Sequence, residues 1–299
     1  QKVCYHLEHP INHPNTIGIY YLANLTNEKG IKVVLSGEGA DELFAGYPRF
    51  LYIFLRNHRI LKFIFKYFKF LEKIFINKLH TKSKNIDDQI IESTSKNNDI
   101  QLRNIFRNYS RDRALKNRRI IYRNIKENNY FKKHRKYEVQ TYLQSLLERQ
   151  DKMNMAFGVE NRVPFLSKEF LEVSLSNRYI KVNFLYFFKA IIFIFTHPKS
   201  VVDVFTKIPL KKEALNIFGG GFTFRKKSGF AFPISEYMRS EKFVYYAENK
   251  LFNILDKTPL SKKEILNIWK NFLVNNNDED QELLWTIFMF LIWLDVFQK

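Results

Sequence analysis

The segment at residues 31–47 constrains the fold more than any other part of the sequence. Residues 31–35 (IKVVL) do not alternate between apolar and polar, a pattern typical of a strand buried on both faces of a parallel sheet. Gly37 and Gly39 follow at once and allow a tight turn, after which a helix is predicted. Because open α/β sheets bind ligands at the carboxyl ends of their strands, residues 36–42 occupy the expected position of a ligand.

Three carboxylates lie in this turn. Glu38, Asp41 and Glu42 stand within five residues of the sequence. Carboxylates at a helix N-terminus also serve as caps and as partners of the helix dipole. Capping and dipole interactions do not require three carboxylates beside two glycines. The pattern therefore favours a site for a hard cation or for acid–base chemistry.

A basic loop is the second chemical element. Residues 224–230 (FRKKSGF) place Arg225, Lys226 and Lys227 between aromatic residues and before a glycine. An exposed basic loop without a function has the same composition. The functional alternative is a clamp for phosphate oxygens, which complements carboxylates that hold Mg²⁺ on the same phosphates.

The rest of the chain is predicted to be mostly helical around a small parallel sheet. A short strand with a loop is expected at residues 1–15, where Pro10 and Pro14 argue against a helix. Residues 82–99 are expected to form a loop, and the glycines at 219–221 a flexible joint. Helices are predicted at residues 16–29, 50–78, 101–109, 114–125, 139–156 and 283–297, with a turn at Pro164 and a further helix after Pro233.

Composition narrows the possible functions. The formal net charge is +19, but the excess of lysine runs through the whole chain, so no specific nucleic-acid partner is expected. The densest basic stretch, residues 103–136, is expected to form a solvated helical face.

The single cysteine, Cys4, excludes an internal disulfide and a multi-cysteine zinc site and indicates a reducing, cytoplasmic setting. No apolar run reaches the roughly 18 residues that a membrane-spanning helix needs.

Several motifs resemble the synthetase domain of the asparagine synthetase (glutamine-hydrolysing) family. They follow in the family's order as VVLSGEGADELFAGYPRF (33–50), DKMNMAFGVENRVPFLS (151–167), RKKSGFAFPISEYM (225–238) and the tryptophan-bearing helix at 283–297. His13, Pro14 and Asn15 also fit the loop before the family's first helix. Two departures are Ala45, where the family usually has glycine, and Ser167, where it usually has aspartate.

The resemblance implies the α/β fold of adenine-nucleotide α-hydrolase-like (ATP pyrophosphatase) domains. Residues 1–299 would form one synthetase domain, with the end of the nucleotide-binding sheet at 1–50 and a mainly helical remainder at 51–299. The family's pyrophosphate loop, Ser-Gly-Gly-x-Asp-Ser, does not occur in the sequence, and the glutaminase domain has no counterpart. The resemblance therefore predicts a chain that begins inside the synthetase domain and is inactive by itself.

The resemblance also implies a reaction. ATP and aspartate would form β-aspartyl-AMP, and ammonia, released from glutamine in the intact protein, would then displace AMP and leave asparagine. Glu38 matches the residue that takes a proton from ammonia, and Lys227 matches the residue that offsets charge at the α-phosphate. Asp41 matches the residue that holds Mg²⁺, and Glu42 beside it is a second predicted ligand. The predicted nucleotide contacts are Ser36, Gly37 and Arg225.

Alternatives stay open at this point. One is an amidotransferase that acts on another carboxylate, such as a sugar acid, and another is an intramolecular amide cyclase. Cyclase relatives tend to differ at the position of Glu38, so this residue favours ammonia as the nucleophile. A non-catalytic basic binding fragment is the alternative from a different class. The expected partners are small molecules (ATP, aspartate, and ammonia or glutamine), and a homodimer is left open.

Overall fold

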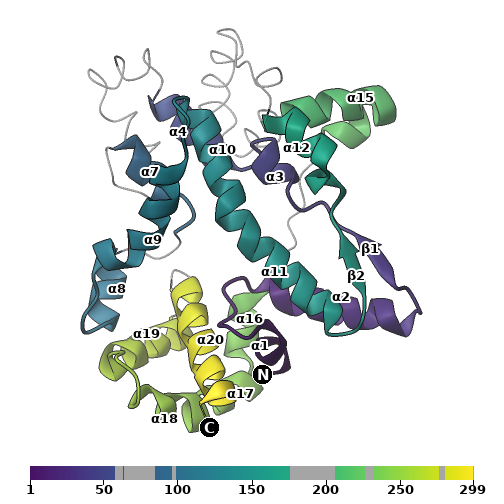
Figure 1. Cartoon of the computed structure of the whole chain (residues 1–299). Coiled ribbons are helices and arrows are strands. Elements are labelled where there is room, and N and C mark those ends of the chain that lie inside the picture. The colour runs from purple at the N-terminus through teal and green to yellow at the C-terminus, as the bar shows by residue number, and fades with distance from the viewer. Residues whose placement is uncertain are drawn as a thin grey trace.

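The computed structural model describes residues 1–57, 63, 85–95, 99–175, 206–225, 232–275 and 280–298. These residues are mostly helical with a two-stranded parallel sheet, as predicted (Figure 1). The elements are α1 (Lys2–Leu7), α2 (Asn15–Glu28), β1 (Val33–Leu35), α3 (Ala40–Leu43), α4 (Pro48–Asn57), α7 (Ile86–Glu92), α8 (Asp99–Ile105), α9 (Arg111–Asn124), α10 (Tyr130–Gln140), α11 (Tyr142–Met155), β2 (Glu160–Arg162), the 3₁₀ turn η1 (Pro164–Leu166), α12 (Lys168–Leu175), α15 (Ile208–Thr223), α16 (Ile234–Arg239), α17 (Glu241–Tyr246), the π-turn η2 (Ala247–Leu251), α18 (Phe252–Leu255), α19 (Lys262–Val274) and α20 (Gln281–Phe297).

The sheet joins two segments that are far apart in the sequence. β1 runs parallel to β2, with Val33 opposite Glu160 and Leu35 opposite Arg162. The strand at β1 was predicted and β2 was not. Val33 is 40% exposed and Leu35 is 73% exposed, so the prediction of a strand buried on both faces is wrong for the described residues. Within these residues β1 pairs with β2 alone, and α11 packs against β2 and α2, which leaves the outward side chains of β1 uncovered.

The C-terminal part builds the largest hydrophobic core around α20. This helix buries nine side chains, which cover most of its circumference, while Thr286 is exposed on the remaining side, so α20 is a largely buried core helix. The helices α1, α16, α18 and α19 and the turn η2 pack against it. The predicted apolar helix at 283–297 is thus confirmed as a core helix. In the part of the chain that the structure describes, no helix is long and apolar enough to cross a membrane.

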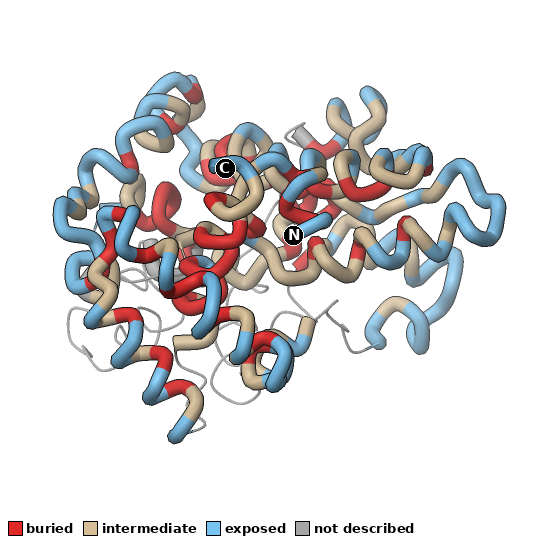
Figure 2. The backbone as a smooth tube through the Cα atoms, turned by 90° about the horizontal axis from the view of Figure 1, so that it is seen from below, coloured by how far each residue is buried: buried red, intermediate tan, exposed pale blue. Residues whose placement is uncertain are grey.

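The N-terminal segment corrects one prediction, because residues 1–15 hold the helix α1 in place of a strand. Val3, Cys4 and Leu7 lie on the buried side of α1, which packs against α20. The two prolines of this segment follow the helix and do not interrupt it. Trp293 Nε1 donates a hydrogen bond to the carbonyl oxygen of Glu8 (3.0 Å) and fixes the end of α1 on α20. The two termini therefore lie close together, beside buried segments (Figures 1 and 2).

Two further predictions need correction and three are confirmed. Residues 82–99 contain the helix α7, whose N-cap Asn85 accepts a hydrogen bond from the backbone N–H of Asp87 (2.8 Å). The helix predicted at 139–156 is divided, because Thr141 leaves the helical region (φ −126°, ψ −76°) between α10 and α11. The helices predicted at 16–29, 101–109 and 114–125 are confirmed as α2, α8 and α9 with shifted ends. Most of the helix predicted at 50–78 lies outside the described residues.

Candidate functional site

The turn at the end of β1 starts where sheet pairing ends. The backbone N–H of Ser36 donates to the carbonyl oxygen of Arg162 (2.9 Å), which prolongs the parallel ladder by one hydrogen bond. Gly39 then adopts φ +88°, a left-handed conformation that favours glycine. A Cβ at this position would lie 2.5 Å from Leu166 Cδ2. Backbone conformation and close packing therefore both require a glycine before α3.

Glu38, the predicted general base, is held by two side chains of α11. Its Oε1 accepts hydrogen bonds from Arg149 Nη2 (3.3 Å) and from Gln150 Nε2 (3.2 Å). The side chain of Glu38 is 19% exposed and that of Arg149 is 8% exposed. Arg149 Nη1 also donates to Asn15 Oδ1 (2.6 Å), at the start of α2. Sequence reasoning missed Arg149 and Gln150, although both directly precede the motif at 151–167.

Asp41, the predicted Mg²⁺ ligand, is paired with a lysine that the sequence analysis did not single out. Lys207 Nζ lies 2.9 Å from Asp41 Oδ1. Gly46 lies against both side chains, because a Cβ there would be 1.8 Å from Asp41 Oδ1 and 2.5 Å from Lys207 Cε. Lys207 itself has φ +52°, just before α15. No motif surrounds Lys207, so only the tertiary structure reveals this contact.

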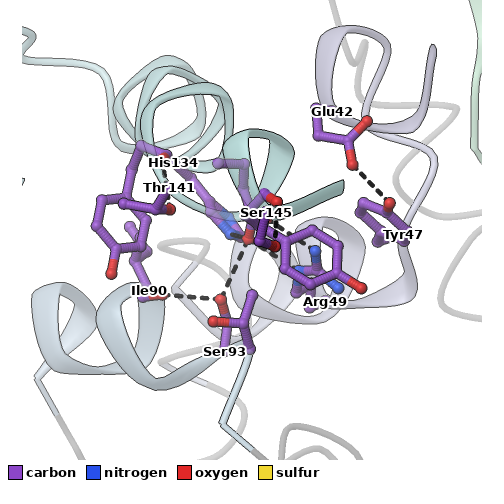
Figure 3. A network of polar contacts seen from close by, with 12 residues as sticks. Glu42, Tyr47, Arg49, Ile90, Ser93, His134, Thr141 and Ser145 are labelled. Atoms are coloured by element: carbon purple, nitrogen blue, oxygen red, sulfur yellow. Dashed lines mark hydrogen bonds and ion pairs between the residues drawn. The ribbon is translucent and has the colours of Figure 1, made fainter. Parts of the chain in front are cut away.

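Glu42 lies in a different environment from the other two carboxylates. It is fully buried, and its Oε1 accepts a hydrogen bond from the Tyr47 hydroxyl (2.6 Å), as Figure 3 shows. Burial raises the pKa of Glu42 above its usual range, against the opposing effect of the Tyr47 hydrogen bond. Burial also raises the pKa of Tyr47, with the Glu42 charge as the next cause. Glu42 as a metal ligand stays a prediction.

An ionic network with a buried carboxylate at its centre joins α4 to α10, next to the candidate turn. Arg49 donates two hydrogen bonds to Glu138, from Nε to Oε1 (2.8 Å) and from Nη2 to Oε2 (2.7 Å), and His134 Nε2 donates to Oε1 (3.1 Å) (Figure 3). The Arg49 guanidinium lies over the Tyr47 ring (3.9 Å) and the Tyr142 ring (4.8 Å). Burial alone would raise the pKa of Glu138, but the bonds from His134 and Arg49 hold it at about 2. The network fixes the start of α4 on α10.

One arginine of the basic stretch is not part of a solvated face. Arg135 is buried and donates to the carbonyl oxygens of Leu43 and Ser174, at the ends of α3 and α12. Burial lowers the pKa of Arg135 to about 10. A cation at the C-terminal end of a helix satisfies carbonyl oxygens that have no partner within the helix. The prediction of a solvated face is confirmed for the exposed residues Arg103, Arg107, Arg113, Lys116 and Arg123.

The predicted nucleotide contacts are placed in part. The Ser36 hydroxyl accepts a hydrogen bond from Asn161 Nδ2 (3.3 Å) across the strand pair, and Gly37 has open space where a Cβ would be. The Arg225 guanidinium lies 4.4 Å from the centre of the Phe222 ring, after α15. Lys227 lies outside the described residues. The structure thus brings Ser36, Gly37, Glu38 and Asp41 together in one turn, and leaves the relation of this turn to Lys227 a prediction.

Among the described carboxylates of the candidate turn, Asp41 has the environment that best suits a divalent cation. Within the described ranges, no three His, Cys, Asp or Glu side chains are grouped so that they could hold a metal ion. Asp41 is a partly exposed carboxylate, a ligand type that suits Mg²⁺ when substrate phosphates complete the coordination. Lys207 occupies one side of that carboxylate, so a cation at Oδ1 requires this ion pair to open.

Comparison with known proteins shows the family to which the chain belongs. The family model for asparagine synthase matches residues 1–295, so the chain belongs to the asparagine synthase family. It is 25% identical over 315 residues to asparagine synthetase [glutamine-hydrolyzing] 1 of Bacillus subtilis (strain 168), covering 98% of this chain and 44% of that protein. The chain thus spans less than half the length of this relative.

Two shorter matches are local. A segment of 33 residues is 64% identical to putative asparagine synthetase [glutamine-hydrolyzing] 1 of Methanocaldococcus jannaschii, over 11% of this chain and 6% of that protein. A segment of 50 residues is 48% identical to amidase chyE of Penicillium rubens, over 17% of this chain and 7% of that protein. No solved structure matches the chain.

Proposed function

We propose that the chain carries the synthetase part of an ATP-dependent ligase that converts aspartate to asparagine. The observation that carries this proposal is the turn after β1, where Glu38 and Asp41 stand at the carboxyl end of a parallel strand. Glu38 is oriented by Arg149 and Gln150 but remains partly exposed, as a general base must be. Membership of the asparagine synthase family supports the same assignment.

The proposed reaction has two steps. The side-chain carboxylate of aspartate attacks the α-phosphorus of ATP, pyrophosphate leaves, and β-aspartyl-AMP forms. Ammonia then attacks the acyl carbon, AMP leaves with the electron pair of the broken C–O bond, and Glu38 accepts the proton that the new amide nitrogen loses. Lys227 is proposed to offset the negative charge that develops at the α-phosphate. Ser36, Gly37 and Arg225 are the proposed nucleotide contacts.

The metal, the fold family and the setting belong to the same proposal. Bound Mg²⁺ would supply charge neutralisation on the phosphates, with Asp41 as its protein ligand and Glu42 as a second proposed ligand. Residues 1–299 are proposed to be one domain of the ATP pyrophosphatase type, with the end of its nucleotide-binding sheet at 1–50. The proposed nitrogen source is ammonia, released from glutamine in the full-length protein, and the proposed setting is the cytoplasm.

Isotope exchange between pyrophosphate and ATP separates the two steps. In the full-length protein, aspartate-dependent exchange is expected together with asparagine formation from ammonia. Glu38→Gln keeps the shape of the side chain and removes the base, so exchange should persist while asparagine formation falls about 10²- to 10⁴-fold. Lys227→Ala should slow exchange while ATP binding, measured by calorimetry, changes little. Absence of aspartate-dependent exchange in the unmodified protein contradicts the proposal.

The identity of the acceptor is tested in the same assay. Other carboxylic acids, a sugar acid among them, replace aspartate one at a time. Exchange that depends on one of these acids and not on aspartate would keep the ligase chemistry and change the substrate. ATP turnover that is absent with every acid, together with salt-sensitive binding of nucleic acid, would favour the non-catalytic basic fragment.

A further inference from the structure

Glu38 is held through one of its two carboxylate oxygens. Arg149 and Gln150 both donate to Oε1, at 3.3 Å and 3.2 Å. Among the described residues no hydrogen bond reaches Oε2. The two donors come from consecutive positions of α11, a helix of the tightly packed pair α2–α11. The carboxylate is therefore fixed by a rigid element on one side and left available on the other.

Arg149 has a second partner that sets its own position. Its Nη1 donates to Asn15 Oδ1 (2.6 Å), and Asn15 begins α2. Arg149 is 7% exposed, so its guanidinium has little freedom to leave this arrangement. The amide of Asn15 is a neutral acceptor and leaves the charge of Arg149 to Glu38. An aspartate at position 15 would compete with Glu38 for that charge.

We propose that Asn15 and Arg149 are positioning residues that aim Glu38 Oε2 at the incoming ammonia. This inference rests on the proposed function. Arg149 and Gln150 occupy Oε1, so Oε2 is the atom that accepts the proton. When the C–N bond forms, the nitrogen carries a positive charge, the C–O bond to AMP breaks with its electron pair on the phosphate oxygen, and one proton passes from nitrogen to Oε2. In this proposal Asn15 and Arg149 act through Glu38 and do not contact the substrate.

The test compares the two half-reactions in the full-length protein. Arg149→Met removes the donor and keeps the length of the side chain. Asparagine formation from ammonia should fall about 10- to 100-fold, since a displacement of about 1 Å in a reacting group costs up to about 10²-fold. Aspartate-dependent exchange of pyrophosphate into ATP should stay within about threefold. Arg149→Lys should recover part of the loss, and Asn15→Asp should lower asparagine formation by drawing Arg149 from Glu38.

The control is Glu148→Gln, one residue earlier on α11, whose carboxylate pairs with His9 and Lys152 away from Glu38. Both half-reactions should be unchanged in this variant. A double-mutant cycle adds a stricter criterion, because Arg149→Met should have no further effect on asparagine formation once Glu38 is glutamine.

Three results would overturn the inference. In the first, Arg149→Met and Asn15→Asp lose pyrophosphate exchange and asparagine formation to the same extent. In the second, asparagine formation is unchanged in both variants. In the third, the effects of Arg149→Met and Glu38→Gln on asparagine formation are additive. The first of these would assign the two residues to folding alone. Absence of aspartate-dependent exchange in the unmodified protein would instead contradict the proposed function, and this inference would then fail as well.

Discussion

The Lys207 ammonium group lies 2.9 Å from Oδ1 of Asp41, and the two side chains meet against Gly46. The predicted metal ligand is therefore already neutralised by a cation from the start of α15. A divalent cation at Asp41 Oδ1 and the Lys207 ion pair exclude each other. Lys207 thus competes for the carboxylate that the proposed function assigns to Mg²⁺.

Lys207→Met should strengthen the binding of a divalent cation in the absence of nucleotide. The pair is partly exposed, and such pairs are worth about 0.2–1 kcal/mol, which corresponds to a gain of about 1.4- to 5-fold in Mn²⁺ affinity. Calorimetric titration with Mn²⁺ measures it. Lys212→Met, an exposed position on α15, is the matched control and should change nothing. Equal affinity in the unmodified protein and in Lys207→Met would contradict the competition.

Gly46→Ala should destabilise the protein. The new Cβ would lie 1.8 Å from Asp41 Oδ1 and 2.5 Å from Lys207 Cε, so at least one of these side chains must move. Overpacking of this kind costs about 1–3 kcal/mol in the free energy of unfolding, which urea denaturation measures. Gly221→Ala is the control, because nothing lies within 4 Å of its Cβ. Equal stability of the two variants would show that the Asp41 and Lys207 side chains can move aside without loss of stability.

Ala45→Gly should stabilise the protein by about 0.5–1 kcal/mol. Ala45 has φ +54° between α3 and α4, a left-handed conformation that is unfavourable for a residue with a Cβ. Glycine, which the resemblance led us to expect at this position, would adopt this conformation without strain. Ala114→Gly, at an exposed site in α9, should do the opposite and cost up to about 1 kcal/mol. Thermal unfolding of both variants measures whether stability rises in Ala45→Gly and falls in Ala114→Gly. A loss of stability in Ala45→Gly would contradict the prediction.

Glu138→Gln should cost about 3–5 kcal/mol in the free energy of unfolding at pH 7, because it leaves the Arg49 guanidinium, 17% exposed, without its fully buried carboxylate partner. Asp256→Asn removes an exposed pair with Lys262 and should cost less than about 1 kcal/mol. Urea denaturation of the two variants under one set of conditions makes the comparison. Similar losses in both would show that the buried network contributes no more than a surface pair.

The same carboxylate predicts a pH dependence. The pKa of Glu138 is about 2 in the folded protein against 4.5 for an unperturbed glutamate, so the unfolded state takes up the proton first as the pH falls. The stabilisation from this group is complete above pH 4.5 and is lost as the pH falls from 4.5 towards 2. Its size is about 3–4 kcal/mol, because the pKa difference of about 2.5 units corresponds to about 1.4 kcal/mol per unit. Urea denaturation between pH 6 and pH 3 should show this loss, and Glu138→Gln should reduce the slope.

Local patterns in the sequence were enough for the elements around the candidate turn. The apolar run before two glycines predicted β1, the turn and α3, and the apolar residues at 283–297 predicted α20. These features depend on contacts between residues a few positions apart, or on backbone conformations that only glycine adopts easily. The same reasoning failed at residues 1–15 and 82–99. There α1 and α7 form because they bury apolar side chains against distant helices, α20 for α1 and α9 for α7.

By itself the sequence determined which residues carry the chemistry and where they stand along the chain, since the type and spacing of Ser36, Gly37, Glu38 and Asp41 are local properties. Only the tertiary structure decided what each of them contacts. Arg149 reaches Glu38 because α11 packs beside α2, and Lys207 reaches Asp41 because α15 begins next to that turn. Glu42 illustrates the same division, since its place in the motif resembles that of Asp41 while the fold buries it against Tyr47. Ion pairs and burial depend on distances between segments remote in sequence, and no local pattern encodes such distances.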